Sequence, residues 1–485
     1  MKNFVFFKIA DKNWLSKSTQ TFLFFLLVIV SIHESVFGQQ TTKPVLSLTT
    51  VVDAAVKNYP SILTRQQLIN VGKAKVEDAR HANLPTITAA DQISFGSDNS
   101  TSGSYFSLGG VIPSVSGGNR AKNKFDIAGG NIAALTASYE VYNFGAYDAL
   151  TNEAVAALHI DEAGLSREKY YLTSNVIQNY FDLAKFADLL ELQQKNIERA
   201  QTIKNSIRAF VINGLKPGVD TSIAEAELSK ARLVYFDLLK NFSLIRQQLA
   251  TFTGLDISVF VPDTGINTKI QNFTKSRQSP ENSRLLTEHH PLIQYYDAIF
   301  EDNLAQQNLI KKSYSPHVFL LASTWLRGSS ITSTDVYDGN PLSGLIYSRG
   351  NYLLGAGITY DLMSTKKMNY KLDVQKFRTE VARDNIAEQK TLLDNYLNQA
   401  DINLEAANNS LKEIPIQYAS ANAAYQQKTA LYNAGLATIV DLTNALYVLN
   451  RAETDNVVVQ SEVWKAVIQK VYAENRINEF LEFIK

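Results

Sequence analysis

The sequence predicts an α+β fold in which β-strands that span a membrane continue into long antiparallel helical hairpins. A set of landmark residues occurs twice along the chain at nearly constant spacing, which indicates an internal two-fold repeat. Segments of alternating apolar and polar residues lie at matching places in both copies, and each copy ends in a very long run of helix-favouring residues. These patterns predict two similar units of strands and long helices.

Composition allows large buried cores without cross-links. The 485 residues are 45% hydrophobic and include no cysteine, so disulfides, thiolate metal sites and thiol catalysis are excluded. Lysine plus arginine and aspartate plus glutamate both number 47, so no charge excess favours binding to nucleic acid. Stability must therefore come from packing or assembly.

The N-terminal segment has the features of a secretory signal. Lysines precede an apolar run from Phe22 to Val30, and short residues at Val36 and Gly38 suit cleavage after Gly38. An uncleaved anchor helix is the alternative, but the run is short for a bilayer. We expect a signal peptide over residues 1–38. No later segment approaches roughly 18 consecutive apolar residues, so we expect any membrane insertion to use β-structure.

Two pairs of prolines mark corresponding helices in the two units. Pro60 opens a helical pattern that ends before Pro85, and Pro291 opens another that ends before Pro316. Both pairs are 25 positions apart. The equal spacing indicates helices of equal length.

A second set of landmarks follows at an equally constant distance. Tyr139 and Gly214 are 75 positions apart, as are Tyr360 and Gly435, and each member of one pair precedes its counterpart by 221 positions. Spacings that agree over this length indicate a common register for the two units. The register places each strand end and each glycine opposite its counterpart.

The two units differ in length mainly in one loop. The distance from Pro85 to Tyr139 is 54 residues against 44 in the second unit, and the additional residues fall in a stretch rich in Ser, Gly and Asn. We expect a first repeat over 39–281 and a second repeat over 282–485.

Each loop lies between two candidate strands of the length that a tilted membrane strand needs, roughly 9 to 11 residues. In the second strand of each unit apolar and polar residues alternate, so one face is apolar and the other polar. The apolar positions are Leu135, Ala137, Tyr139 and Val141 in the first unit and Tyr352, Leu354, Ala356, Ile358, Tyr360 and Leu362 in the second. The sequence predicts strands at about 85–96, 133–145, 316–328 and 351–363.

Each strand pair is followed by a long helical region that turns and returns as a second helix. The predicted hairpins cover 146–253 and 366–484 and are rich in Ala, Leu, Glu, Gln, Lys and Asn. A continuous helix of about 68 residues would be roughly 100 Å long. Pro415 predicts a kink or break near Ile414 in the second hairpin.

A membrane sheet of four strands has two open edges whose backbone groups lipid does not satisfy. The barrel must therefore close between chains, and three chains would supply twelve strands, enough for an open interior. The hairpins would then form a ring of helices that continues the channel. Nothing in the residue pattern fixes the number of chains.

The chain resembles the outer membrane factor family, the TolC-like efflux and secretion channels. The resemblance covers nearly the whole mature chain and rests on three segments in order, Leu48–Pro60, Tyr142–Gly145 and Tyr432–Leu442. It implies a homotrimer with a twelve-stranded transmembrane β-barrel in the outer membrane of a Gram-negative bacterium, continued by an α-helical barrel in the periplasm. It also implies a mixed belt around the tunnel, to which we assign 255–282 and the chain ends.

The resemblance further implies a passive exit duct of a tripartite efflux or type I secretion system. Its partners would be outer-membrane lipid, a periplasmic adaptor protein and an inner-membrane pump. The alternatives are a secreted coiled-coil rod or adhesin, for which the four strands have no use, and an autonomous porin. No phosphate loop, serine elbow or carboxylate-histidine constellation is present in the sequence, so we expect neither an enzyme nor a cofactor.

The hairpin tips are the candidate functional site. By the resemblance they form a periplasmic gate, and Asp220 and Asp441 are candidates to line it as a ring of carboxylates that favours cations. Their structural alternative is helix capping, with Gly214 and Gly435 at left-handed helix ends. Tyr432 resembles a family tyrosine that ties closed helices together, with core packing as its alternative.

The tips depart from the best-known pattern of the family at two positions. Ala437 is found where a gate-clamping arginine can occur, and Asn444 is found where another aspartate can. Lys216 in the other tip is a candidate replacement cation. Pro217 should stiffen the first tip, which leaves the second hairpin as the one expected to move.

His289 and His290 are adjacent, which is not the spacing of helical metal ligands. They precede the helix-opening Pro291, so we expect a solvated helix start and no metal.

Overall fold

A computed structural model of the chain describes residues 47–99, 119, 121–256, 260, 262–263, 269–270, 273 and 289–485. The signal peptide expected over 1–38 and most of the belt expected over 255–282 lie outside the described residues.

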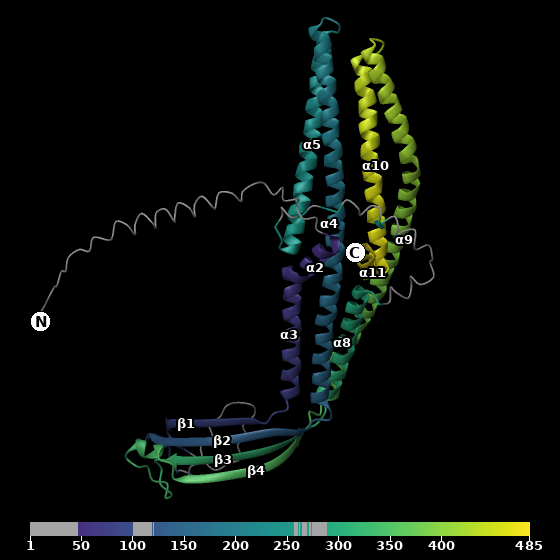
Figure 1. The fold of residues 1–485 in the computed structure, drawn as a ribbon. Coiled ribbons are helices and arrows are strands. Elements are labelled where there is room, and N and C mark those ends of the chain that lie inside the picture. Colours follow the sequence, from purple (N-terminus) through teal and green to yellow (C-terminus); the bar gives the residue numbers. More distant parts are fainter. Residues whose placement is uncertain are drawn as a thin grey trace, which may run out of the picture.

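The chain forms a long column of helices with a four-stranded sheet at one end (Figure 1). The elements in the first part are α2 (Leu48–Asn58), α3 (Pro60–His81), β1 (Thr86–Gly96), β2 (Ala128–Tyr142), α4 (Ala146–Ile212) and α5 (Gly218–Thr253). Those in the second part are α8 (Pro291–Ser313), β3 (His317–Ser329), the 3-10 helix η2 (Pro341–Leu345), β4 (Arg349–Thr359), α9 (Ser364–Asn433), α10 (Ile439–Ala473) and α11 (Ile477–Ile484). The order of helix, two strands, long helix and returning helix therefore occurs twice.

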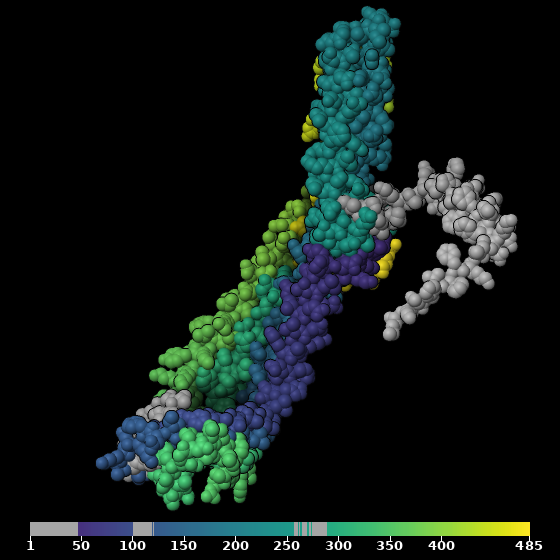
Figure 2. Space-filling model, turned by 90° about the vertical axis from the view of Figure 1, so that its left-hand side faces the viewer, coloured from purple at the N-terminus to yellow at the C-terminus, as the bar shows by residue number. Residues whose placement is uncertain are grey.

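Two antiparallel hairpins, α4 with α5 and α9 with α10, make up most of the column and carry their tips far from the sheet (Figures 1 and 2). The first helices of the hairpins are 67 and 70 residues long, which corresponds to roughly 100 Å at 1.5 Å per residue. Among the helices of the described residues, none has the length and hydropathy needed to cross a membrane.

Of the kink or break expected near Ile414, the break does not occur. Residue Pro415 lies inside α9, and the helix continues on both sides of it. A proline removes one backbone hydrogen bond of a helix. Here α9 packs along α10 over much of its length, and Ile414 is buried, so tertiary contacts preserve the helix.

The four strands form one antiparallel sheet in the order β1-β2-β3-β4. Strand β2 begins at Ala128, about five residues before its expected start, because it pairs with the whole of β1 up to Gly96. Strand β4 begins at Arg349 and ends at Thr359, earlier than expected. The Met363 amide donates to the Asp361 side chain at 2.9 Å, which turns the chain into α9.

The register gives the sheet two chemically different faces. Directly paired residues share a face, and successive residues of a strand alternate between faces. The apolar face carries exposed side chains from all four strands: Ile87, Ile93, Leu135, Tyr139, Leu320, Leu326, Tyr352, Leu354 and Ile358. The polar face carries Thr88, Gln92, Thr136, Ser138, Glu140, Ser323, Arg327, Arg349 and Asn351, together with the apolar Ile132, Phe319, Leu321, Trp325 and Leu353. In a protein surrounded by water, other elements would pack on an apolar face of this kind, whereas here its side chains are exposed.

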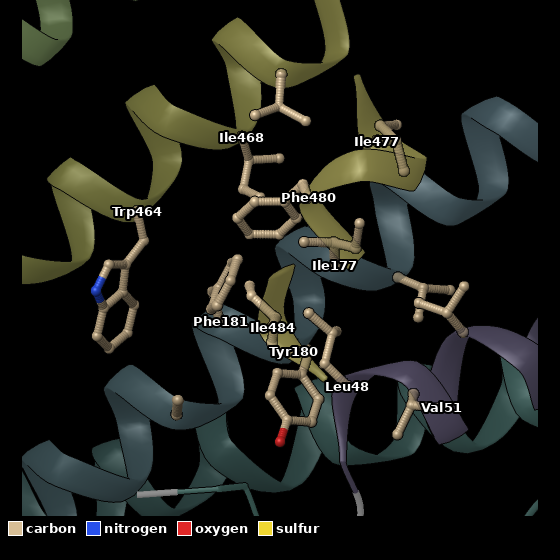
Figure 3. Packing of buried hydrophobic residues seen from close by; sticks show 14 of the residues in the cluster. Leu48, Val51, Ile177, Tyr180, Phe181, Trp464, Ile468, Ile477, Phe480 and Ile484 are labelled. Atoms are coloured by element: carbon tan, nitrogen blue, oxygen red, sulfur yellow. The ribbon is translucent and has the colours of Figure 1, made fainter. Parts of the chain in front are cut away.

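The largest hydrophobic cluster among the described residues lies in the middle of the column and joins α2 to α11. In Figure 3, Tyr180 and Phe181 of α4 lie among side chains from α10, α11 and α2. The Phe181 ring is 5.6 Å from the Trp464 ring and 6.3 Å from the Phe480 ring, measured between centroids. This cluster ties the two hairpins together between the sheet and the tips.

The expected solvated helix start at His290 is wrong in one respect. This histidine caps α8, since its Nδ1 accepts from the Leu292 amide at 3.1 Å, but the side chain is fully buried. Its Nε2 donates to the Tyr472 carbonyl oxygen at 3.1 Å, and the rings of Tyr170 and Tyr472 cover it. Burial lowers the pKa of His290 to about 4, so the imidazole is neutral at pH 7.

Candidate functional site at the hairpin tips

Both hairpins turn at a glycine in the left-handed conformation. Gly214 has a φ of +71° and Gly435 has a φ of +79°, a region that a Cβ atom disfavours. In each tip the amide of the next residue, Leu215 or Leu436, donates at 2.9 Å to a carbonyl oxygen in the last helical turn. The two tips therefore close in the same way.

The first tip places Asp220 in the opening turn of α5, directed at the second hairpin. Its Oδ2 accepts a hydrogen bond from the Tyr432 hydroxyl at 3.1 Å, and its side chain is only 8% exposed. Pro217, expected in the first helical turn, is instead the N-cap residue just before Gly218. Asp220 therefore links the hairpins within one chain.

Tyr432 combines core packing with this polar contact. Only 1% of the residue is exposed, and its ring packs with Ile207, Ala224, Ile439 and Leu442. Burial, and then the hydrogen bond to the Asp220 carboxylate, raise the pKa of Tyr432 to about 12. The hydroxyl is therefore a stable donor at neutral pH.

Lys216 also reaches across to the second hairpin. Its Nζ lies 4.5 Å from the centroid of the Tyr432 ring, within the range of a cation–π contact. Tyr432 thus contacts two side chains of the first tip. A cation lies over the face of its ring, and a carboxylate accepts a hydrogen bond from its hydroxyl. Three side chains connect the two tips at this point, and we call them the tip clasp: Lys216, Asp220 and Tyr432.

Asp441 has a different environment, in the first turn of α10 at the second tip. It forms a capping box with Thr438: the Asp441 amide donates to the Thr438 hydroxyl at 3.2 Å, and Asp441 Oδ2 accepts from the Thr438 amide at 3.0 Å. The Thr438 amide and hydroxyl, and then Lys428 at 3.8 Å, hold the pKa of Asp441 below its ordinary value. The carboxylate is partly exposed and does not join the tip clasp.

A second connection between the hairpins lies further from the tips and was not expected from the sequence. Arg199 of α4 forms an ion pair with Glu453 of α10, and both side chains are mostly buried. Arg199 also donates to Asn196 at 2.5 Å, Asn196 donates to Gln193 at 3.3 Å, and Gln193 donates to the Ala231 carbonyl oxygen at 2.8 Å. This polar chain runs from α5 through α4 to α10. Its one sequence signal is the three-residue spacing of the polar side chains on α4.

A cavity of about 570 Å³ lies between the hairpins, bounded by both connections. Its lining includes Arg199, Ile207, Tyr425, Tyr432 and Glu453. Within the part of the chain that the structure describes, no three His, Cys, Asp or Glu side chains cluster in a way that could hold a metal ion.

The sequence matches a family model, and the fold matches solved structures. Residues 51–255 match the model of the family described as outer membrane efflux protein. No curated protein sequence matches the chain.

Several solved structures share the fold at low sequence identity. The structure of CusC matches with a TM-score of 0.71 and 14% identity, over 91% of this chain and 95% of that one. The CmeC outer membrane channel of Campylobacter jejuni matches with a TM-score of 0.68 and 14% identity, over 90% of both chains. VceC from Vibrio cholerae matches with a TM-score of 0.66 and 15% identity, over 88% of this chain and 95% of that one.

A four-stranded sheet with an open apolar face, continued by two hairpins about 100 Å long, defines the class of outer-membrane channels with a helical extension. The chain matches the outer membrane efflux protein family over residues 51–255. It is an exit channel of efflux systems that is located in the outer membrane and extends into the periplasm. The alternative of a secreted coiled-coil rod is not supported.

Proposed function

We propose that three copies of this chain form one passive duct, which receives its cargo in the periplasm from an adaptor protein and an inner-membrane pump. The duct binds no nucleotide and performs no chemistry, and the pump supplies the energy. The observation behind this proposal is the open sheet. Its exposed apolar face suits contact with lipid, and its unpaired edges are stable in lipid only if the sheet closes with other copies.

The sheet edges support closure between copies. Strands β1 and β4 lie at the two edges of the sheet and are 11 residues long each. In a bilayer each unpaired backbone group costs several kcal/mol. If β1 of one copy pairs with β4 of the next, three copies give a closed barrel of twelve strands with the polar face toward the lumen.

An unpartnered stripe on α9 supports the same assembly. Tyr370, Val374, Phe377 and Val381 are all exposed and follow one another at intervals of four, three and four residues. This is the spacing of a seam between packed helices. The stripe lies in the part of α9 nearest the sheet, where closure of the barrel brings the helices of the next copy alongside.

The repeated order of elements supports an origin by duplication, with units over 39–281 and 282–485. We assign α3, β1, β2, α4 and α5 to the first unit and α8, β3, β4, α9 and α10 to the second. Three copies then give a ring of six hairpins.

The tips are the proposed gate. In a ring of six hairpins, Gly214 and Gly435 lie at the periplasmic opening, and the tip clasp holds neighbouring hairpins together in the closed state. Asp441, partly exposed beside the clasp, is placed to present a carboxylate to the opening.

Native mass spectrometry of the detergent-extracted protein tests the assembly. We expect the mass of three mature chains, and we expect the protein to remain in membranes washed with carbonate. Phe377→Glu should shift the mass toward single chains, because it places a charge in the stripe. A single-chain mass for the unmodified protein, or its release by the wash, would refute the proposal.

A further inference from the structure

The connection between β3 and β4 folds back onto the sheet instead of extending away from it. It includes η2, which lies at the free end of the sheet (Figure 1). We define the strap as Asn340–Tyr347. Its Tyr347 hydroxyl donates to Asp91 Oδ1 of β1 at 2.9 Å, and its Leu345 carbonyl oxygen accepts from the Asn131 side chain of β2 at 3.2 Å. The strap therefore crosses from β4 back to β1.

The backbone of the strap lies directly against the backbone of the sheet. A Cβ atom added to Gly129 would lie 1.9 Å from the Pro341 carbonyl oxygen, and one added to Gly344 would lie 2.0 Å from the Gly129 carbonyl oxygen. A Cβ atom on Gly328 would lie 2.3 Å from the Ile346 carbonyl oxygen. Only glycine allows this approach at the three positions, so the seat of the strap is built into the sequence.

The strap lies on the apolar face. Asp91 pairs with Ala133, and Asn131 pairs with Gly328, so Asp91 and Asn131 share the face of Leu135 and Leu326. They are the carboxylate and the amide that interrupt this face near the free end of the sheet. Asn131 is only 8% exposed, and its side-chain amide group donates to the strap, while the Asp91 carboxylate accepts from Tyr347.

The outer side of the strap is itself apolar. Leu342 is 60% exposed and Ile346 is 73% exposed, and no residue of Asn340–Tyr347 is charged. Tyr347 adds an amphipathic ring of the kind found at membrane interfaces. The strap thus lies over the buried Asn131 and adds an apolar surface that continues the apolar face.

The position of the strap agrees with the height of that face. On β4 and just beyond it, apolar side chains follow from Tyr352 to Tyr360, about nine residues, which span roughly 30 Å along the strand. A strand tilt of about 40° reduces this to roughly 23 Å, close to the height of about 25 Å of the apolar band in outer-membrane barrels. The strap begins where this band ends.

We propose that the strap is a membrane-interface anchor, which inserts Leu342 and Ile346 at the boundary between lipid head groups and acyl chains of the outer leaflet. It covers Asn131, binds Asp91 through the Tyr347 hydroxyl, and fixes the depth of the barrel. This inference rests on the proposed duct, in which the apolar face contacts lipid.

The natural lack of cysteine allows single labels to test the anchor. Ile346→Cys, Leu354→Cys and Thr136→Cys are labelled with a fluorophore, and the proteins are reconstituted in phosphatidylethanolamine–phosphatidylglycerol vesicles. The vesicles carry a quencher either at the head group or in mid-chain. We expect at least twofold quenching of the Ile346 label by the head-group quencher, of the Leu354 label by the mid-chain quencher, and little quenching at Thr136.

The labels at Ile346 and Leu354 distinguish a failure of the anchor from a failure of the duct. If Leu354 is quenched and Ile346 is not, the anchor is refuted and the duct remains. If Leu354 is not quenched either, the proposed orientation of the barrel fails together with the anchor.

Gly129→Ala tests the seat of the strap in the Ile346-labelled protein. The added methyl group meets the Pro341 carbonyl oxygen, so the strap should lift and head-group quenching should fall by half or more, with no change at Leu354. Gly355→Ala is the matched control, since nothing lies within 4 Å of a Cβ atom there. Unchanged quenching at Ile346 in Gly129→Ala would overturn the proposed seat.

Discussion

The Tyr432 hydroxyl donates a hydrogen bond to the Asp220 carboxylate at 3.1 Å, across the two hairpin tips and between residues 212 positions apart. Both side chains are buried, so the bond does not compete with water within the chain. Because each partner belongs to a different hairpin, the hairpins separate at the tips only if this bond breaks.

Tyr432→Phe should loosen the tips. The substitution keeps the ring and its packing but removes the donor to a buried carboxylate, a loss of about 1.5–3 kcal/mol. This corresponds to roughly a tenfold or larger shift toward separated tips. Spin labels at Leu215→Cys and Leu436→Cys, both on exposed tip residues, measure the tip distance by pulsed EPR. Tyr447→Phe, on an exposed tyrosine of α10, is the control. Identical distance distributions for Tyr432→Phe and the control would contradict the clasp.

Lys216→Gln should have a smaller effect in the same assay. The contact of its ammonium with the Tyr432 ring is worth about 0.5–1 kcal/mol, or roughly a two- to fivefold shift. The effect should largely disappear in a Tyr432→Leu background, because the aromatic partner is then absent. Lys230→Gln, which removes a longer contact with the exposed Tyr447, should not change the tip distance. A Lys216→Gln effect that persists in the Tyr432→Leu background argues against the cation–π contact.

Arg199→Met should destabilise the hairpin pair, since it leaves Glu453 mostly buried without its partner. We expect a loss of about 1–3 kcal/mol, measured as a lower midpoint of thermal unfolding in detergent. The double variant Arg199→Met with Glu453→Met should be less affected, because no unpaired charge remains. Lys195→Met removes an exposed pair with Glu191 and should leave the midpoint unchanged. Equal midpoints for Arg199→Met and Lys195→Met would show that the buried pair does not brace the hairpins.

Asp302 on α8 should make the folding stability of the protein depend on pH. Burial, and then the nearby Glu153, raise the pKa of Asp302 to about 6 in the folded protein. The folded state therefore binds a proton more tightly than the unfolded chain. The carboxylate destabilises the fold above pH 6 by about 2–3 kcal/mol, and this penalty is relieved as the pH falls toward 4.

Asp302→Asn removes this penalty, so the variant should unfold at a higher temperature than the unmodified protein at pH 7.5 and at a similar temperature near pH 4. Asp373→Asn, on an exposed α9 residue paired with Lys376, controls for the loss of one charge. A difference between Asp302→Asn and the unmodified protein that is constant from pH 4 to 8 would contradict the assignment.

Patterns within one element allowed much of the fold to be predicted. The alternation from Leu135 to Val141 defined the faces of β2, and the helical composition with Gly214 and Gly435 defined the two hairpins. These features depend on neighbours a few residues away, and a sequence shows such neighbours directly. The capping box at Thr438 and Asp441 was predictable for the same reason and is confirmed.

Contacts between distant segments were harder to predict. Arg199 and Glu453 are 254 positions apart and have no local pattern that pairs them. His290 was expected in solvent because it precedes the helix-opening Pro291, whereas Tyr170 and Tyr472 bury it from other helices. The strap was not predicted, because glycines such as Gly129 and Gly344 are also typical of exposed loops. Their role depends on the close approach of two backbone segments, which the sequence does not show.

Single-channel conductance in planar bilayers tests whether copies of this chain form a duct that is closed at the tip clasp. The purified protein should insert with a small conductance, and the double variant Asp220→Asn with Tyr432→Phe should conduct several-fold more, because its tips are no longer tied. If neither protein forms any pore, although each is extracted as a folded membrane protein, the chain does not form this duct.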